Sequence, residues 1–367
     1  MPSTEVPRPP LGRPRGPRRG AAIARLAPLA GTAFFLALLA AAAPVAAQTL
    51  KMATLAPQGS IWDQAIRSMG ERWTKDTAGR VQLRVYAGGV AGDESDALRK
   101  TRAGQFQGLA ITVAGLTEID TAFNVFQIPM YFQSFEELYF VLAELRPALE
   151  ARLAAKGYVL LHWGHGGWIH LFSRQPIRTL DDLRQQKLFV WAGDDSAVQT
   201  WKKNGFQPVA LAATDIMLGF QTKMIDVVPT TPIAALTLQW YRQTPYMLGM
   251  GLAPLAGGVV MTKTAWEKIA PGDRELVLAA AHTTEKELER EVPKQDQSAI
   301  DQMRQRGLTV VEITAEQEKG WHEEAKRFAV AARDGRVPAE ILEATEAAIA
   351  KFRSRAPAGA AATGAGH

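Results

Sequence analysis

The sequence predicts an α/β fold in which strands and helices alternate along the chain. Residues 81–85 alternate apolar and polar side chains, the period of a half-exposed strand, and they follow a segment with apolar residues at helical spacing. Such alternation is typical of βαβ units. A strand pattern returns late, at 255–262, and a length of 367 residues favours roughly two domains. Each domain is therefore expected to contain two separate stretches of chain.

The first part of the chain supplies the elements of one expected domain. A strand is expected at 49–55, and Ser60 with Asp63 forms a capping-box pattern that starts a helix. Pro129 interrupts the apolar stretch 123–132, which predicts an extended or turn path there. The other elements expected in this part are strands at 106–113 and 158–163 and helices over 93–103 and 134–153.

The second part of the chain supplies the remaining elements. A capping-like pattern near Thr214 predicts a helix that runs to Phe220. The charge-laced region 273–306 predicts a long helix, which Pro293 is expected to kink or break. The other elements expected here are a helix start at 179–183, strands at 187–191 and 308–313, a strand end at 227–228, and helices over 315–332 and 338–353.

The two ends of the chain have compositions unlike the rest. Residues 1–47 combine an Arg-rich start, an apolar run over 26–43 and a small-residue cleavage pattern ending at Ala47. This is the pattern of a signal peptide, so the mature protein is expected to begin at Gln48 in the periplasm, exported by the Sec rather than the twin-arginine route. An uncleaved membrane anchor is the alternative. The low-complexity tail 356–367 is expected to be disordered.

Charge and cysteine content narrow the class of function. Residues 1–47 hold six of the 42 Lys and Arg residues and one of the 37 acidic residues, so the mature chain carries 36 of each and no net charge. A nucleic-acid partner is therefore not expected, because phosphate binding needs a clustered positive face. The absence of cysteine excludes disulfides, thiol catalysis and cysteine-ligated metal. The sequence also lacks a P-loop and an HExxH motif, and no cofactor is expected.

A series of short motifs supports a family resemblance. Residues 50–105 run through a strand, a Pro-x-Gly-Ser turn, a Trp-bearing helix, a Thr-x-Gly-Arg-Val strand and a Tyr-x-Gly-Gly end. Further motifs are Pro-Met-Tyr-Phe at 129–132, Thr-Leu-Asp-Asp-Leu at 179–183 and Met-Ile-Asp at 224–226. From about residue 49 to residue 350, the chain resembles the DctP-type substrate-binding proteins of TRAP transporters.

The resemblance implies a two-lobed clamp like the periplasmic binding proteins, with hinge strands and a long helix that spans both lobes. It implies that the protein binds a small organic solute between the lobes without chemistry and delivers it to the membrane subunits of a TRAP permease. The expected lobes are 48–167 plus 255–297 for lobe I and 168–254 plus 298–355 for lobe II.

The expected ligand site departs from the family pattern. Most of the family carries a ligand-binding arginine where this chain has Phe189, and a second arginine often stands at the place of Trp168. Thr112 and Gly115 occupy the positions of a Glu and an Arg in sugar-acid binders, and Thr230 replaces an Asn. A buried carboxylate without a partner costs several kcal/mol, so the ligand is expected to be apolar or aromatic. The other expected ligand-binding residues are Trp62, His165, Trp191 and Thr214.

Several alternatives remain open from the sequence. Phe189 and Trp191 share one face of a strand, so both could be core residues with the ligand held elsewhere. A carboxylate could instead be held by another cation, such as Arg174 or Lys187. The protein could also be a sensor or carrier of a hydrophobic molecule outside transport, or a periplasmic hydrolase, although the sequence shows no nucleophile constellation. A zinc site could be suggested by His162, His165 and His170, but these side chains are expected to be hydrogen-bonded or exposed rather than to bind a metal.

Overall fold

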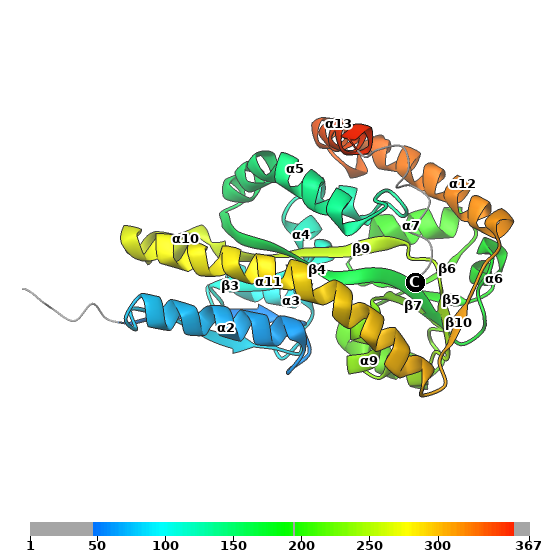
Figure 1. Cartoon of the computed structure of the whole chain (residues 1–367), viewed down its shortest axis with the longest axis horizontal. Coiled ribbons are helices and arrows are strands. Elements are labelled where there is room, and N and C mark those ends of the chain that lie inside the picture. Colours follow the sequence, from blue (N-terminus) through cyan, green and yellow to red (C-terminus); the bar gives the residue numbers. More distant parts are fainter. Residues whose placement is uncertain (1–46, 194, 356–367) are drawn as a thin grey trace, which may run out of the picture. The chain divides into compact units, whose positions relative to one another are not determined.

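The structure, a computed structural model, describes residues 47–193 and 195–355 (Figure 1). The expected disordered tail and, apart from Ala47, the expected signal peptide lie outside the described residues. The strands are β1 (Gln48–Thr54), β2 (Val81–Tyr86), β3 (Gly108–Thr112), β4 (Tyr158–Ser173), β5 (Lys187–Trp191), β6 (Gln207–Leu211), β7 (Val227–Thr230), β8 (Tyr246–Leu248), β9 (Ala253–Thr262) and β10 (Thr309–Val311).

Helices lie between most of these strands, as the sequence predicts. The α-helices are α2 (Ile61–Asp76), α3 (Glu94–Arg102), α4 (Val113–Ile119), α5 (Phe135–Ala155), α6 (Leu180–Arg184), α7 (Asp195–Lys203), α8 (Ile216–Gln221), α9 (Pro232–Thr237), α10 (Lys263–Lys268), α11 (Pro271–Arg304), α12 (Ala315–Ala331) and α13 (Ala339–Arg355). Short 3-10 helices are η1 (Thr121–Gln127), η2 (Ala213–Asp215) and η3 (Trp240–Arg242), and η4 (Ala332–Arg336) is a π-helix.

Strand β4 belongs to two half-sheets, which gives the fold its two lobes. The strand order is β2-β1-β3-β9-β4-β7-β5-β6, with β8 paired to β4 and β10 paired to β8. Strand β4 pairs with β9 from Tyr158 to Ile169 and with β7 from His170 to Ser173. We call β1, β2, β3, β9 and the start of β4 the first half-sheet, and the end of β4 with β5, β6, β7, β8 and β10 the second half-sheet.

Helix α11 lies across both half-sheets, as Figure 1 shows in yellow and orange. It packs on α2 beside the first half-sheet, on β4 in the middle and on α9 beside the second. The indole N–H of Trp73 in α2 donates to the carbonyl of Val277 at 3.2 Å and anchors the first of these contacts. The expectation of a long lobe-spanning helix is therefore confirmed.

The predicted helix starts at Ser60, Ser134 and Thr179 are also confirmed. Each side chain accepts a hydrogen bond from the backbone N–H three residues on, and Thr179 with Asp182 forms a complete capping box. Side-chain caps of this kind stabilise a helix by about 1 kcal/mol, because they satisfy an N–H that has no partner within the helix.

Other local predictions were confirmed only in part. Pro293 does not break α11, because contacts along the whole helix offset the lost hydrogen bond. Ile128 is extended and Pro129 lies in a turn, as expected, but Thr121–Gln127 form a 3-10 helix that was not predicted. The helix expected near Thr214 is present as η2 and α8, but neither has a side-chain cap.

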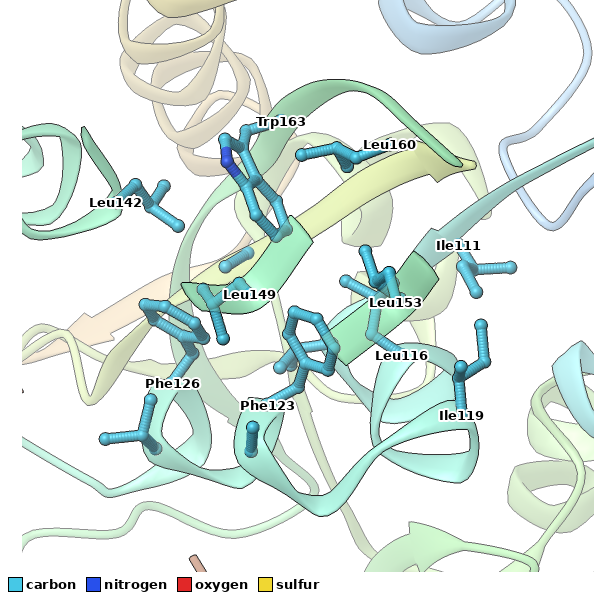
Figure 2. Close-up of a cluster of buried hydrophobic side chains, with 14 of the residues drawn as sticks. Ile111, Leu116, Ile119, Phe123, Phe126, Leu142, Leu149, Leu153, Leu160 and Trp163 are labelled. Atoms are coloured by element: carbon cyan, nitrogen blue, oxygen red, sulfur yellow. The ribbon is translucent and has the colours of Figure 1, made fainter. Parts of the chain in front are cut away.

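The largest apolar core lies beside the first half-sheet. Figure 2 shows side chains from η1, α5 and β4 that point toward one another, with the rings of Phe123 and Trp163 5.9 Å apart. A second cluster, around Phe172 and Phe220, lies beside the second half-sheet. Each fully buried Leu or Phe contributes about 1.5–3 kcal/mol, so a core of its own stabilises each half-sheet.

Candidate functional site

A cavity of about 720 Å³ lies between residues of the two half-sheets. From the first half-sheet it is lined by Thr54 and Thr112, the last residues of β1 and β3, and from the second by Trp191 and Thr230, the last residues of β5 and β7. These strands run parallel within each half-sheet. Carboxyl ends of parallel strands are where α/β proteins bind ligands, so this cavity is the candidate site.

The cavity contains most of the residues selected from the sequence. Those that line it are Trp62, Thr112, His165, Phe189, Trp191, Thr214 and Thr230. Gly115 and Trp168 are not among the described lining residues. The N–H of Gly115 donates to Glu94 at 2.8 Å, and a side chain at that position would collide with the same carboxylate. The N–H of Trp168 donates to Asp296 at 3.1 Å, and its ring lies 5.4 Å from Phe135.

Strand β5 supplies an aromatic wall. The rings of Phe189 and Trp191 meet edge to face with their centroids 5.6 Å apart. Both pack with the core cluster around Phe172, while Leu188 and Val190 pack on the opposite side of the strand. Phe189 is only 3% exposed, yet it lines the cavity. It is therefore both a core residue and part of the cavity wall.

The three histidines of β4 are buried but do not form a metal site. His162 donates through Nδ1 to the carbonyl of Trp163 at 2.7 Å, and His170 donates through Nδ1 to the carbonyl of Leu248 at 2.9 Å. The Nε2 of His165 bonds the hydroxyl of Tyr139. Among residues 47–193 and 195–355, no three His, Asp or Glu side chains are grouped so that they could hold a metal ion.

Burial keeps two of these imidazoles neutral. It lowers the pKa of His162 and of His165 to about 4, because the charged ring would be cut off from water. Both residues line the cavity. At neutral pH they therefore contribute ring surface and hydrogen-bonding atoms to the protein interior, without a positive charge that would attract an anion.

The charged residues of the cavity wall were missed by the sequence analysis. They are Glu94, Glu324 and Arg336. Glu94 accepts the N–H of Thr112 at 2.7 Å and its hydroxyl at 2.9 Å, besides the N–H of Gly115. Burial nevertheless raises its pKa to about 7. An acid in the first turn of a helix is common, so its sequence position gave no signal of a cavity role.

The two cations considered from the sequence lie away from the cavity wall. Arg174 is 3.7 Å from Asp226 and donates to the carbonyl of Phe220. Lys187 donates from Nζ to the carbonyl of Lys223 at 2.9 Å. Of the Lys and Arg side chains that the structure describes, Arg336 alone lines the cavity. Its position in the π-helix η4 could not be foreseen, because a π-helix is rare and has no simple sequence pattern.

Comparison with known proteins agrees with this geometry. The family model for bacterial extracellular solute-binding protein, family 7 (DctP), matches residues 52–332. A solute-binding protein of Chromohalobacter salexigens is 26% identical over 226 residues, which are 61% of this chain and 67% of the relative. The sialic acid-binding periplasmic protein SiaP of Vibrio cholerae is 20% identical over 284 residues, 76% of this chain and 87% of the relative.

Solved structures show the same fold. An extracytoplasmic solute receptor of Bordetella pertussis that binds pyroglutamic acid has a TM-score of 0.77 at 19% identity, covering 83% of this chain and 100% of the other. A sugar acid-binding protein of Advenella mimigardefordensis in complex with galactonate also has a TM-score of 0.77, at 18% identity, covering 83% and 98%. The shared fold is the two-lobed α/β clamp.

Within residues 47–193 and 195–355, no helix is both long enough and apolar enough to cross a bilayer.

Proposed function

Because the chain belongs to the DctP family of extracellular solute-binding proteins, the receptors of TRAP transporters, we propose that it captures a largely apolar or aromatic solute. The solute is held between the two lobes, without chemical change, and passed to the membrane subunits of a TRAP permease. The observation that carries the ligand class is Phe189, which stands in the cavity wall where the resemblance places an arginine.

The size and lining of the cavity support this ligand class. A volume of about 720 Å³ suits an organic molecule, since such sites usually measure about 300–1,000 Å³. Phe189 and Trp191 offer two rings at an angle, against which an apolar or aromatic group gains free energy by losing contact with water. Their position on a packed strand keeps the rings in place before the ligand arrives.

The charge of the wall disfavours an anion near the first half-sheet. Glu94 lies in that wall with a pKa of about 7, so it is partly ionised at neutral pH. Its oxygens already accept the N–H groups of Thr112 and Gly115 at the start of α4. A ligand carboxylate would therefore meet a like charge and find these donors taken.

A small organic acid held by Arg336 is the second candidate. Arg336 is in the cavity wall, and a guanidinium can bind a carboxylate through two parallel hydrogen bonds. The receptors from Bordetella pertussis and Advenella mimigardefordensis bind pyroglutamic acid and galactonate, respectively. In this alternative Phe189 would bound the cavity without selecting the ligand.

The finer organisation is part of the proposal. We assign 48–167 plus 255–297 to lobe I and 168–254 plus 298–355 to lobe II, joined by strands that include β4. The mature receptor begins near Gln48 after cleavage at Ala47 and acts in the periplasm. Genetics distinguishes transport from a role as a sensor or carrier outside transport. A receptor for transport needs a permease gene in the same organism, and deletion of the receptor gene should abolish uptake of the solute.

Extraction of the natural ligand tests the ligand class directly. The mature protein is purified from its host without unfolding, then denatured and extracted, and the extract is identified by mass spectrometry. We expect a small apolar or aromatic molecule in a near-stoichiometric amount. A dicarboxylate or sugar acid would overturn the apolar ligand and favour the second candidate. Chemical alteration of the recovered molecule on incubation with fresh protein would overturn the assignment as a receptor.

A further inference from the structure

A side-chain hydrogen bond of Asp93 links the two lobes beside the cavity. The backbone N–H of Ala213, the first residue of η2, donates to Oδ2 of Asp93 at 3.3 Å. Asp93 precedes α3 in the first lobe, and η2 follows β6 in the second half-sheet. Ala213 and the adjacent Glu94 both line the cavity. The bond therefore bridges the two sides of the cavity between residues 120 positions apart in sequence.

The same carboxylate caps a helix in its own lobe. Oδ1 of Asp93 accepts the N–H of Glu94 at 2.9 Å, at the start of α3. In the second lobe the residue before η2 is Ala212, whose methyl group cannot accept a hydrogen bond. Asp93 thus supplies from across the cavity the acceptor that Ser, Thr, Asp or Asn usually provides locally at a helix start.

Other atoms at this place are in close contact. A side chain on Gly89 would lie 2.9 Å from Cγ2 of Thr214, and one on Gly193 would lie 3.6 Å from Oγ of Ser95. The loops after β2, β5 and β6 therefore meet here. Gly89 also has a φ of +74°, so a larger residue would be both strained and obstructed in this arrangement.

We propose that Asp93 is the positioning residue that holds the cavity closed around a bound solute, by capping the helix of the opposite lobe. This inference rests on the proposed function only in that the solute binds between the lobes; it does not depend on which solute binds. When the lobes separate, Asp93 keeps its bond to Glu94, and the N–H of Ala213 passes to water. When the lobes close, Oδ2 of Asp93 again accepts the N–H of Ala213.

The bond is suited to be reversible. Burial has the largest effect and raises the pKa of Asp93, the N–H groups of Glu94 and Ala213 lower it, and the charges of Asp96 and Asp215 raise it. The like charge of Asp215 weakens the gain from bringing the Asp93 carboxylate to the second lobe, and a distance of 3.3 Å is at the long end for an N–H to oxygen bond. A receptor must release its solute to the permease, so a strong permanent bridge would prevent its function.

Asp93→Ser is the variant that separates the two roles of the side chain. Serine is as good a helix cap as aspartate, so α3 should keep its start. Its hydroxyl is shorter than a carboxylate and cannot serve Glu94 and Ala213 together. Asp93→Asn keeps a side chain of the same reach but only one acceptor oxygen, and its NH2 group cannot accept the second N–H, so it should also lose one of the two bonds. Thr262→Ala is the matched control, because it removes the cap of α10, which starts after the end of β9.

The first measurement follows lobe closure itself. The chain contains no cysteine, so Gln105→Cys in lobe I and Lys203→Cys in lobe II can carry a unique pair of spin labels. Protein purified from its host without unfolding keeps any ligand that it carries. We expect a larger fraction of long, open distances in Asp93→Ser than in the wild type and in Thr262→Ala. Equal distance distributions in Asp93→Ser and the wild type would overturn the proposal.

The second measurement uses the neutral fluorophore N-phenyl-1-naphthylamine as an apolar probe. We expect Asp93→Ser to release it about 5- to 10-fold faster than the wild type with little change in the association rate, since closure acts after binding. Unchanged release would contradict the closing role of Asp93. Failure of the wild type to bind this fluorophore would count against the apolar ligand, while the spin-label distances would still decide the role of Asp93. Circular dichroism shows that each variant is folded.

Discussion

The carboxylate of Asp296, in the second half of α11, accepts the backbone N–H of Trp168 at 3.1 Å. This bond lies at the bulge of β4 between His165 and Trp168, just before the strand passes from β9 to β7. The other oxygen of Asp296 accepts the N–H of Ile233 in α9 at 3.3 Å. One side chain thus fixes the long helix to the strand shared by both half-sheets and to a helix of the second.

Asp296→Asn should change how stability depends on pH. Burial raises the pKa of Asp296 to about 7, so the folded protein holds this proton more tightly than the unfolded chain. The wild type therefore loses stability as pH rises from about 4 to about 7, and the variant lacks this loss. We expect the unfolding free energy of the variant, relative to the wild type, to increase by about 1–3 kcal/mol between pH 5 and pH 8. Urea unfolding followed by circular dichroism measures it.

The difference between the two proteins is the quantity to compare, because other groups titrate in the same range. Glu94, whose pKa burial raises to about 7, contributes a loss of the same sign to both proteins. Glu94→Gln should therefore show a pH-dependent gain of its own. A constant difference between Asp296→Asn and the wild type from pH 5 to pH 8 would show that Asp296 is ionised throughout this range.

The buried histidines should make the free energy of unfolding change with pH in the opposite direction. Burial lowers the pKa of His162 to about 4, whereas an unfolded histidine takes up its proton near 6.5. Stability is therefore lost as pH falls from about 6.5 to about 4. In His162→Leu this loss should be smaller by about 1–3 kcal/mol between pH 7.5 and pH 4.5. Leu161→Ala, at the fully buried neighbouring position, should lower stability equally at both pH values.

Local patterns explain what the sequence could predict. The capping residues Ser60, Ser134 and Thr179 act on N–H groups three positions away, so the relevant atoms lie within one short window. Phe189 and Trp191 lie on the same face of β5 because side chains alternate between the two faces of a strand. These features can be predicted without the tertiary structure. The order of strands and helices that suggested the family consists of such local features.

The features that the sequence could not show depend on tertiary contacts. Trp168 was expected in the cavity, but the bulge after His165 changes which way the following side chains point. Glu94 acts on Thr112, and Asp93 acts on Ala213, across long stretches of chain. A sequence read alone gives each acid the same role, a favourable charge at a helix start.

Phe189→Leu should weaken ligand binding without unfolding the protein. Loss of ring area at the cavity wall should raise the dissociation constant of N-phenyl-1-naphthylamine or of the extracted solute about 5- to 10-fold. Phe220→Leu is the control, since Phe220 belongs to the same core cluster but is not among the described lining residues. It should lower the melting temperature at unchanged affinity. Calorimetry that finds equal affinities for both variants and the wild type would make Phe189 a core residue only.

Arg336→Gln distinguishes the two candidate ligand classes. If the ligand is apolar, its affinity should change less than about twofold, because the aromatic wall on β5 remains. If the ligand is an organic acid, loss of a charged hydrogen-bond donor should weaken binding by about 10- to 100-fold. Arg333→Gln is the control from the same π-helix, where Arg333 pairs with Glu346 and is not among the described lining residues. A large loss of affinity for the extracted solute in Arg336→Gln, with none in Arg333→Gln, would contradict the apolar ligand. It would show instead that the ligand is an organic acid whose carboxylate binds Arg336.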